Sequence, residues 1–259
     1  MATIENIFCE DWQDFKSKFV LSLYNNVHFE KNIYIFRGQR SANWRLQSSF
    51  DRWFSTSMAE DRQELFLSLM KIFKEQCDFY DLPEDFLKDE IWMIALAQHY
   101  GLPTRMLDWS ESPYIAAFYA FSEAAIAGEL EDDCAIWAID KRVNMWGAKQ
   151  GADIIELRQK GNIKIRNQSG IFTLLHTSQS CLEEYVDESA DNNTALYKFT
   201  IPTTDMWNAL ADLDAMGINH QKLFPGLNGC AIAAKLTLMN KLEARNGLFN
   251  FRVSEIEQI

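Results

Sequence analysis

One apolar segment, from Pro113 to Phe121, most constrains how this chain folds. Ser112 and Pro113 are typical of the N-cap and first position of a helix, and almost every residue through Phe121 is apolar. A helix that is apolar on all sides is buried, so the chain needs a core around it. Hydrophobic residues make up 47% of the 259 residues and aromatic residues 13%, which is enough for such a core. We therefore expect a folded globular protein, and a single domain over 1–259 suits the length.

Other segments show the periodicities of helices and strands. Helices are predicted at Ser57–Cys77, from Pro83 to Gly101, from Thr204 to Gly217 and at Gly229–Lys241, and strands at Asn32–Phe36, Ala135–Ile139, Gly170–Leu175 and Ala195–Ile201. The segment Leu102–Ser110 is too short and too mixed for a helix, and the acidic run from Glu183 to Glu188 is typical of a solvated loop. Helices dominate the first half and strands the second. This indicates an α+β fold, with a helical N-terminal half packed on a mixed β core.

Charge and cysteine content exclude several classes of protein. The 25 Lys and Arg against 37 Asp and Glu give a net charge of −12, which argues against a protein that coats nucleic acid. The five cysteines are odd in number and never spaced as CxxC, so neither a disulfide framework nor a zinc site is indicated, and the four dispersed histidines predict no metal centre. No leader pattern opens the chain, and no apolar run is long enough to span a membrane. We expect a cytoplasmic protein without a membrane partner.

Polar side chains of several kinds gather in the segment Ala97–Pro113, between two predicted helices. No P-loop, Rossmann, HExxH or GxSxG motif is present, so this segment is the strongest candidate for a site. An alternative is that Arg105 and Asp108 form a buried structural pair while Trp109 fills the core. Arg37 has the same ambiguity, although a following glycine at a strand end would leave backbone clearance for a ligand.

These segments resemble the FRG domain family, which is named for a Phe-Arg-Gly motif. Here that motif is Phe36-Arg37-Gly38, and the stretch from Gln98 to Ala120, QHYGLPTRMLDWSESPYIAAFYA, resembles the most characteristic part of the family. Arg166-x-Gln168-x-Gly170-x-Phe172, Gly217-Ile218 and Leu223-Phe224-Pro225-x-Leu227-x-Gly229 resemble its later part. The resemblance covers roughly Ile33 to Ala234 and implies one FRG-type domain with a core at about 30–235.

A more distant resemblance is to ADP-ribosyltransferases of the Arg, Ser-Thr-Ser, Glu class. In those enzymes a strand carries an arginine, a later strand carries a hydroxyl motif just before a helix, and a further strand carries a glutamate. Arg37, the segment Leu107–Ser110 before Pro113, and Gln168-x-Gly170-x-Phe172 follow the same order. The resemblance implies NAD as substrate and an ADP-ribosyltransferase-like fold. Its implied catalytic residues are Arg37, Asp108, Ser110 and Gln168, and its implied NAD-binding residues are Arg37, Gly38, Gln39, His99, Thr104, Arg105, Trp109 and Tyr119.

NAD chemistry suits these residue types. An arginine fork binds a pyrophosphate, an aromatic face such as Trp109 or Tyr119 suits a nicotinamide ring, and an anion stabilises the positive charge that forms on the ribose. Gln168 is neutral where the family pattern has a glutamate. Either it only orients the ribose or the acceptor, or the anion is Asp108 or Glu111, or the site binds a nucleotide without cleaving it.

The leading hypothesis is an NAD-dependent ADP-ribosyltransferase-like enzyme, of a kind that would suit a toxin or a phage-defence effector. Its acceptor would be a protein or a nucleic acid, and a neutralising partner would fit such a role. The acidic charge favours a protein acceptor, whereas a basic groove around Arg40, Arg45 and Arg52 would favour nucleic acid. The alternative is a non-catalytic module that binds a nucleotide or a protein. A nuclease or glycosidase using Asp108 and Glu111 is more remote.

Overall fold

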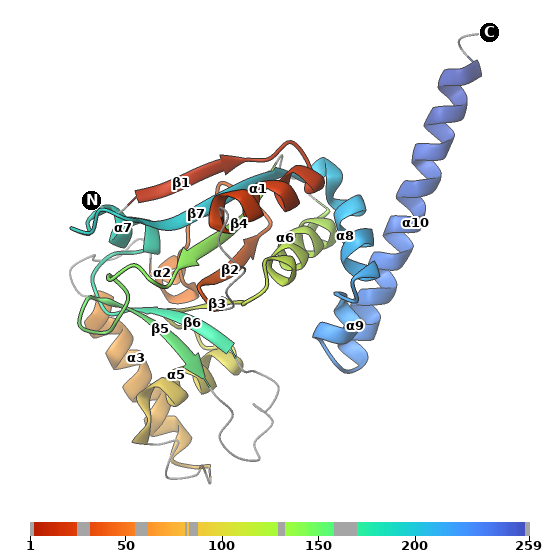
Figure 1. The fold of residues 1–259 in the computed structure, drawn as a ribbon. Coiled ribbons are helices and arrows are strands. Elements are labelled where there is room, and N and C mark those ends of the chain that lie inside the picture. The colour runs from red at the N-terminus through yellow and green to blue at the C-terminus, as the bar shows by residue number, and fades with distance from the viewer. Residues whose placement is uncertain are drawn as a thin grey trace.

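The computed structural model describes residues 3–24, 32–54, 62–80, 82, 88–128, 133–157 and 170–256. The fold is mixed α/β, with strands divided between a sheet of order β1-β7-β4-β2 and a sheet of order β3-β6-β5 (Figure 1). The strands are β1 (Thr3–Phe8), β2 (Tyr34–Gln39), β3 (Met106–Trp109), β4 (Asp133–Asp140), β5 (Ala152–Leu157), β6 (Gly170–Leu175) and β7 (Thr194–Pro202). The helices are α1 (Trp12–Tyr24), α2 (Ser49–Trp53), α3 (Arg62–Cys77), α5 (Glu90–His99), α6 (Pro113–Ala127), α7 (Leu182–Asp187), η3 (Thr203–Asp205), α8 (Met206–Ala215), α9 (His220–Leu223) and α10 (Leu227–Ile256).

The larger sheet is buried on both faces because its strands are apolar on both sides. Phe36 and its alternate neighbours pack against α1, α6 and α8, in a core that includes Phe121 and Phe199. Ile35 and Ile139, on the opposite face, pack toward the smaller sheet. The two sheets therefore share one core, and helices cover the outer face of the larger sheet.

A third core lies on the outer face of the smaller sheet. Phe172 and Leu174 of β6 pack there with Phe66 of α3 and Trp92 of α5. Figure 1 shows α3 and α5 beside this sheet, on the side away from α6. Side chains on the inner face of β3 and β6 are correspondingly enclosed between the sheets.

Several predicted elements are confirmed, most of them with local sequence signals. The strand at Gly170–Leu175 has the predicted bounds, and the strands expected at Ala135–Ile139 and Ala195–Ile201 are β4 and β7. Ser112 caps α6, its Oγ accepting a hydrogen bond from the Ile115 amide at 3.3 Å, and Pro113 occupies the first position. Gly101 and Gly217 end their helical segments with φ of +86° and +81°.

The expected segregation holds in the first half, where helices outweigh strands among the described residues, but the expected dominance of strands in the second half is wrong. β1, β2 and β3 lie in the first half beside its longer helices, and α10, the longest of the described helices, closes the second half. The segment Met106–Trp109 is a strand because β6 supplies its hydrogen-bonding partner more than 60 residues later, which no local pattern reveals. β1 and β5 were not predicted. The acidic run is not a solvated loop either, since residues 182–187 form α7 and Glu183 accepts from the Leu46 amide at 2.9 Å.

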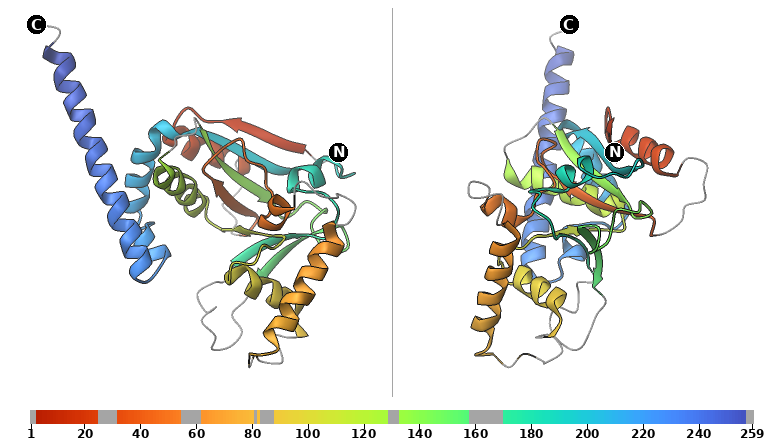
Figure 2. Two further views of the ribbon diagram at one scale, coloured as in Figure 1. Left: turned by 180° about the vertical axis from the view of Figure 1, so that it is seen from behind. Right: turned by 90° about the vertical axis from the view of Figure 1, so that its left-hand side faces the viewer.

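Other boundaries shift or fall outside the described residues. The capping box expected at Ser57 and the helix start expected at Pro83 lie outside them. Thr204 does not cap α8, because it lies within η3 and α8 follows directly. Two views in Figure 2 show α10 extending away from the rest of the fold. Within the described ranges, no helix is both long and apolar enough to cross a membrane.

Candidate functional site

The predicted segments meet at a seam where β2, β3 and α6 come together. The Phe36 amide donates to the Ser110 carbonyl oxygen and the Ser110 amide donates to the Phe36 carbonyl oxygen, both at 2.7 Å. This bridge joins β2 to the end of β3. β3 in turn pairs with β6, where Asp108 lies opposite Phe172. The arginine strand, the Asp108–Ser110 segment and β6 are thereby neighbours.

Gly38 allows α6 to lie directly against β2. A Cβ at Gly38 would collide with the carbonyl oxygen of Ala116 and stand 2.9 Å from the Ala120 amide nitrogen. Glycine is therefore needed here for contact with the helix and not, as the sequence suggested, for clearance toward a ligand. The contact brings the polar residues of α6 to the seam.

Arg37 is held at the seam by the backbone of β3. Its Nη1 donates to the Asp108 carbonyl oxygen at 2.8 Å and lies 4.0 Å from Asp108 Oδ2. The side chain is 24% exposed, and Nε is buried without a hydrogen-bond partner among the described residues. Burial lowers the pKa of the guanidinium, while Asp108 and Glu123 act in the opposite direction. Arg37 lies within β2, which is an edge strand, rather than at the end of the strand as expected.

A relay of hydrogen bonds orients the Asp108 carboxylate. Thr104 Oγ1 donates to Gln98 Oε1 at 2.8 Å, and Gln98 Nε2 donates to Asp108 Oδ1 at 2.7 Å. Partial desolvation by the surrounding protein raises the pKa of the Asp108 carboxyl, although 65% of the side chain is exposed, and Arg37 and Gln98 partly oppose this rise. Thr104 is buried and donates to Gln98, so its side chain lies behind the carboxylate and not at the surface of the seam.

Two further titratable groups come from α6. Burial raises the pKa of Tyr119, and the neighbouring charges of Asp108 and Glu123 raise it further. Partial desolvation also raises the pKa of Glu123, although the residue is exposed, and Arg37 and Arg40 oppose this rise. Tyr119 was a predicted site residue, whereas Glu123 was missed. Its signal is that it is the only charged residue in α6, one helical turn after Tyr119.

Arg105 belongs to a buried network away from the seam residues. Its Nε lies 3.3 Å from Asp51 Oδ2, and its terminal nitrogens donate to Gln63 and to the carbonyl oxygens of Thr177 and Gln179. The alternative in which Arg105 pairs with Asp108 is therefore wrong, because Arg105 pairs with Asp51. The guanidinium is fully enclosed and holds α2, α3 and the 177–179 segment together.

Two other predicted binding residues are structural. Trp109 is 6% exposed in the core between the sheets, and its Nε1 donates to Thr173 Oγ1 at 2.9 Å, so its ring does not face the seam. Gln39 is also buried, because its Nε2 donates to the Arg45 carbonyl oxygen and its Oε1 accepts from Trp137. Both side chains point into the shared core because alternate residues of a strand face opposite sides.

The remaining predicted residues lie at the margin of the seam or outside the described chain. Ser110 Oγ accepts from the Ser112 amide at 3.0 Å, so its hydroxyl shapes the turn before α6. His99 is exposed at the end of α5, with its ring edge against Tyr100. Gln168 falls outside the described residues.

The basic groove considered around Arg40, Arg45 and Arg52 is only partly formed. Arg45 pairs with Glu184 at 2.9 Å. Arg40 stacks over Trp44 at 4.8 Å, and Arg52 donates to the Gln47 carbonyl oxygen. Arg52 also lowers the pKa of Arg37, as a neighbouring positive charge does. Two of the three arginines therefore add positive charge near the seam.

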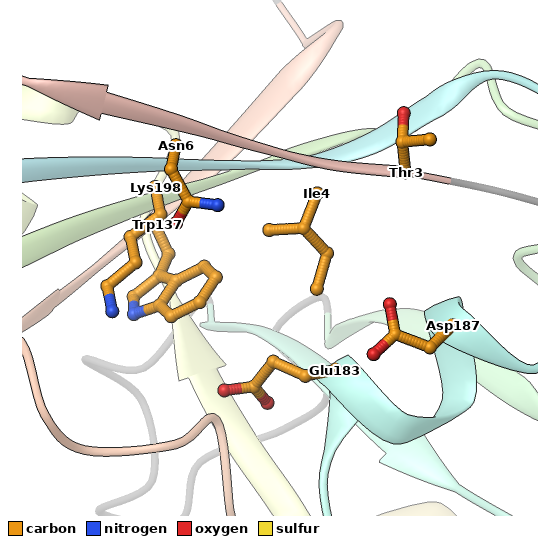
Figure 3. A pocket seen from close by; sticks show the side chains of 7 residues that line it. All are labelled: Thr3, Ile4, Asn6, Trp137, Glu183, Asp187 and Lys198. Atoms are coloured by element: carbon orange, nitrogen blue, oxygen red, sulfur yellow. The ribbon is translucent and has the colours of Figure 1, made fainter.

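A separate hollow of about 640 Å³ lies between β1, β7 and α7 (Figure 3). Figure 3 shows Glu183 and Asp187 of α7 below Ile4, with Trp137 and Lys198 at one side. Lys198 already has a hydrogen-bond partner within the protein, because its Nζ donates to the Ala42 carbonyl oxygen at 2.6 Å. None of the predicted site residues lines this hollow. Within the described ranges, no group of three or more His, Cys, Asp or Glu could hold a metal ion.

Comparison with known proteins identifies one match. Residues 32–128 match the FRG domain family. The match spans β2 through α6 and so includes Arg37, Asp108, Tyr119 and Glu123, but it does not extend over the later segments that also resemble the family. Neither the curated proteins nor the solved structures give a match.

Proposed function

Starting from the FRG domain over residues 32–128, we propose that this protein is an NAD-dependent ADP-ribosyltransferase-like enzyme with its site at the seam. The supporting observation is that β2, β3 and β6 are neighbours, through the Phe36–Ser110 bridge and the β3·β6 ladder. These are the three segments whose order resembles the Arg, Ser-Thr-Ser, Glu class. Residues from separate strands can act on one substrate only if those strands lie side by side.

Arg37 is the residue proposed to bind the NAD pyrophosphate. Its Nε has no partner among the described residues, although Nη1 is anchored to the backbone of β3. A guanidinium fixed at one nitrogen keeps its fork in one orientation, and the remaining donors suit the oxygens of a phosphate. Low exposure strengthens this interaction, because few water molecules compete for the donors.

Asp108 is proposed to stabilise the positive charge that develops on the ribose. The Gln98 amide holds one of its oxygens, so the carboxylate does not need to reorient during the reaction. Tyr119 takes the aromatic role that the sequence divided between Trp109 and Tyr119, because the indole is buried and the phenol is only half-buried. Its ring also lies edge-on to Phe224 at 5.8 Å.

Calorimetric titration with NAD tests the binding step. We expect wild-type protein to bind NAD and Arg37→Ala to lose at least about tenfold in affinity, the effect of losing a charge-assisted phosphate contact. Arg245→Ala, an exposed arginine on α10, is the matched control and keeps the wild-type affinity. Equal affinities for Arg37→Ala and wild type would contradict the proposal. Binding without any nicotinamide release would favour the non-catalytic module.

A cellular test addresses the proposed role as a toxin or phage-defence effector. Depletion of NAD, or modification of an essential macromolecule, stops growth whichever acceptor is used. Induced expression of wild-type protein in bacteria is therefore expected to arrest growth, and expression of Arg37→Ala at the same level is not. Arrest by both proteins would indicate toxicity unrelated to the seam.

A further inference from the structure

Glu123 is a charged residue on the side of α6 that contacts β2. Pro113–Ala127 contains no other charged residue, and nine of its fifteen residues are buried. Glu123 lies seven residues after Ala116 and three after Ala120, so the three share one face of the helix. Ala116 and Ala120 are the residues whose backbone touches Gly38 of β2. Glu123 therefore extends the contact line between α6 and β2, beside the strand that carries Arg37.

The polar groups around Glu123 do not form hydrogen bonds or ion pairs with one another. Glu123 is exposed and Tyr119 is half-buried, and neither the Glu123 carboxylate nor the Tyr119 hydroxyl has a hydrogen bond or ion pair with another described residue. Arg37 Nε is buried without a partner among the described residues. Arg40, on the α6 side of β2, is stacked on Trp44 without a carboxylate partner. These groups lie together at the surface and are open to a ligand, and the buried Arg37 Nε is the one whose hydrogen bond a ligand would complete.

Asp108 and Glu123 differ in how many of their carboxylate oxygens already have a partner in the protein. Gln98 donates to one oxygen of Asp108, and Arg37 stands 4.0 Å from the other. Both oxygens of Glu123 remain open to a substrate. Partial desolvation by the surrounding protein raises the pKa of Glu123 even though the residue is exposed, and a more basic carboxylate is a better proton acceptor.

We propose that Glu123 is a catalytic residue of the seam, the general base that takes the proton of the nucleophile attacking the ribose of NAD. This inference rests on the proposed function. With Glu123, the site has a second carboxylate, carried by a helix. The residue that follows the order of the glutamate in the ADP-ribosyltransferase pattern is Gln168, which is neutral.

The proposed step is a substitution at the anomeric carbon of the nicotinamide ribose. The bond from that carbon to the nicotinamide nitrogen breaks, and its electron pair goes to the ring, which leaves as neutral nicotinamide. A lone pair of the nucleophile, which is water or a hydroxyl or amine of an acceptor, forms the new bond. Glu123 takes the proton from the nucleophile and later releases it to solvent. No electrons are exchanged with an oxidant or a reductant.

Nicotinamide release with water as nucleophile provides the test, alongside calorimetric NAD binding. In Glu123→Gln we expect the rate at saturating NAD to fall about 100-fold or more while the Kd stays within about threefold, because a general base contributes to the chemical step. Glu243→Gln, on the exposed surface of α10, is the matched control and keeps the wild-type rate. Formate, a small carboxylate, is expected to restore part of the rate of Glu123→Ala, which a structural role would not allow.

The outcomes separate the two proposals. If wild type releases nicotinamide and Glu123→Gln does so within about twofold, or if formate fails to restore Glu123→Ala, the assignment of Glu123 is overturned and the proposed function stands. If wild type binds NAD without releasing nicotinamide, the general base is also overturned, while Arg37 keeps its binding role. If wild type does not bind NAD, both proposals fail.

Discussion

The substitution Gly38→Ala tests how the seam is built. A Cβ at this position would stand 2.8 Å from the carbonyl carbon of Ala116 and 2.9 Å from the Ala120 amide nitrogen, and closer to the Ala116 oxygen. All three atoms are helix backbone, so no change of rotamer relieves the clash and α6 must move. Overpacking of this kind costs about 3 kcal/mol. A strand gains about 1 kcal/mol when alanine replaces glycine. The expected net loss is therefore about 2 kcal/mol or more.

Urea unfolding followed by tryptophan fluorescence measures this loss, since the chain has 8 tryptophans. Gly101→Ala is the control, because Gly101 has a φ of +86° and no heavy atom within 4 Å of the added Cβ. Its cost is only backbone strain, about 1 kcal/mol. If Gly38→Ala destabilises the protein no more than Gly101→Ala does, glycine is not required there for the contact with α6.

Three further predictions concern Arg105, Asp108 and the cysteines. Arg105→Ala should lower the free energy of unfolding by about 3–5 kcal/mol in urea denaturation, because it leaves Asp51 buried beside an emptied space, and a loss below about 1 kcal/mol would contradict this network. Partial desolvation raises the pKa of Asp108, so the folded state binds that proton more tightly than the unfolded state, by a small margin because the side chain is 65% exposed to solvent. Stability should therefore gain as pH falls through the raised pKa, and Asp108→Asn should remove that gain in urea melts across pH; an unchanged pH profile would refute it. In native protein, iodoacetamide should label exposed Cys230 before Cys9, whose pKa burial raises to about 12, and mass spectrometry showing the reverse order would contradict the packing.

Local signals in the sequence were sufficient for several parts of the fold. Ser112 and Pro113 identify the start of α6 because the cap is made by neighbouring residues. The strand at Gly170–Leu175 is apolar and β-branched, and it has the predicted bounds. The position of Arg37 next to the Asp108 segment was also expected, from the order of motifs alone, and the bridge at Ser110 places them together.

The features that could not be predicted from the sequence depend on contacts between residues far apart in the chain. Arg105 contacts Asp51, which lies 54 residues earlier, although Asp108 is nearer in sequence. The direction of Trp109 depends on the register of β3 with β6, which sends the indole into the core and Asp108 to the seam. Glu123 could have been found as the lone charge of an apolar helix, but its neighbours on β2 become clear only through the contact at Gly38.

Proton NMR of NAD incubated with the purified protein tests the central claim most directly. The account predicts that free nicotinamide accumulates with wild-type protein and that folded Arg37→Ala releases none at the same concentration, because the donors proposed to hold the pyrophosphate are lost. Circular dichroism of both proteins establishes that they are equally folded. Equal release by wild type and Arg37→Ala, or unchanged NAD spectra with wild type together with no calorimetric binding, would contradict the account.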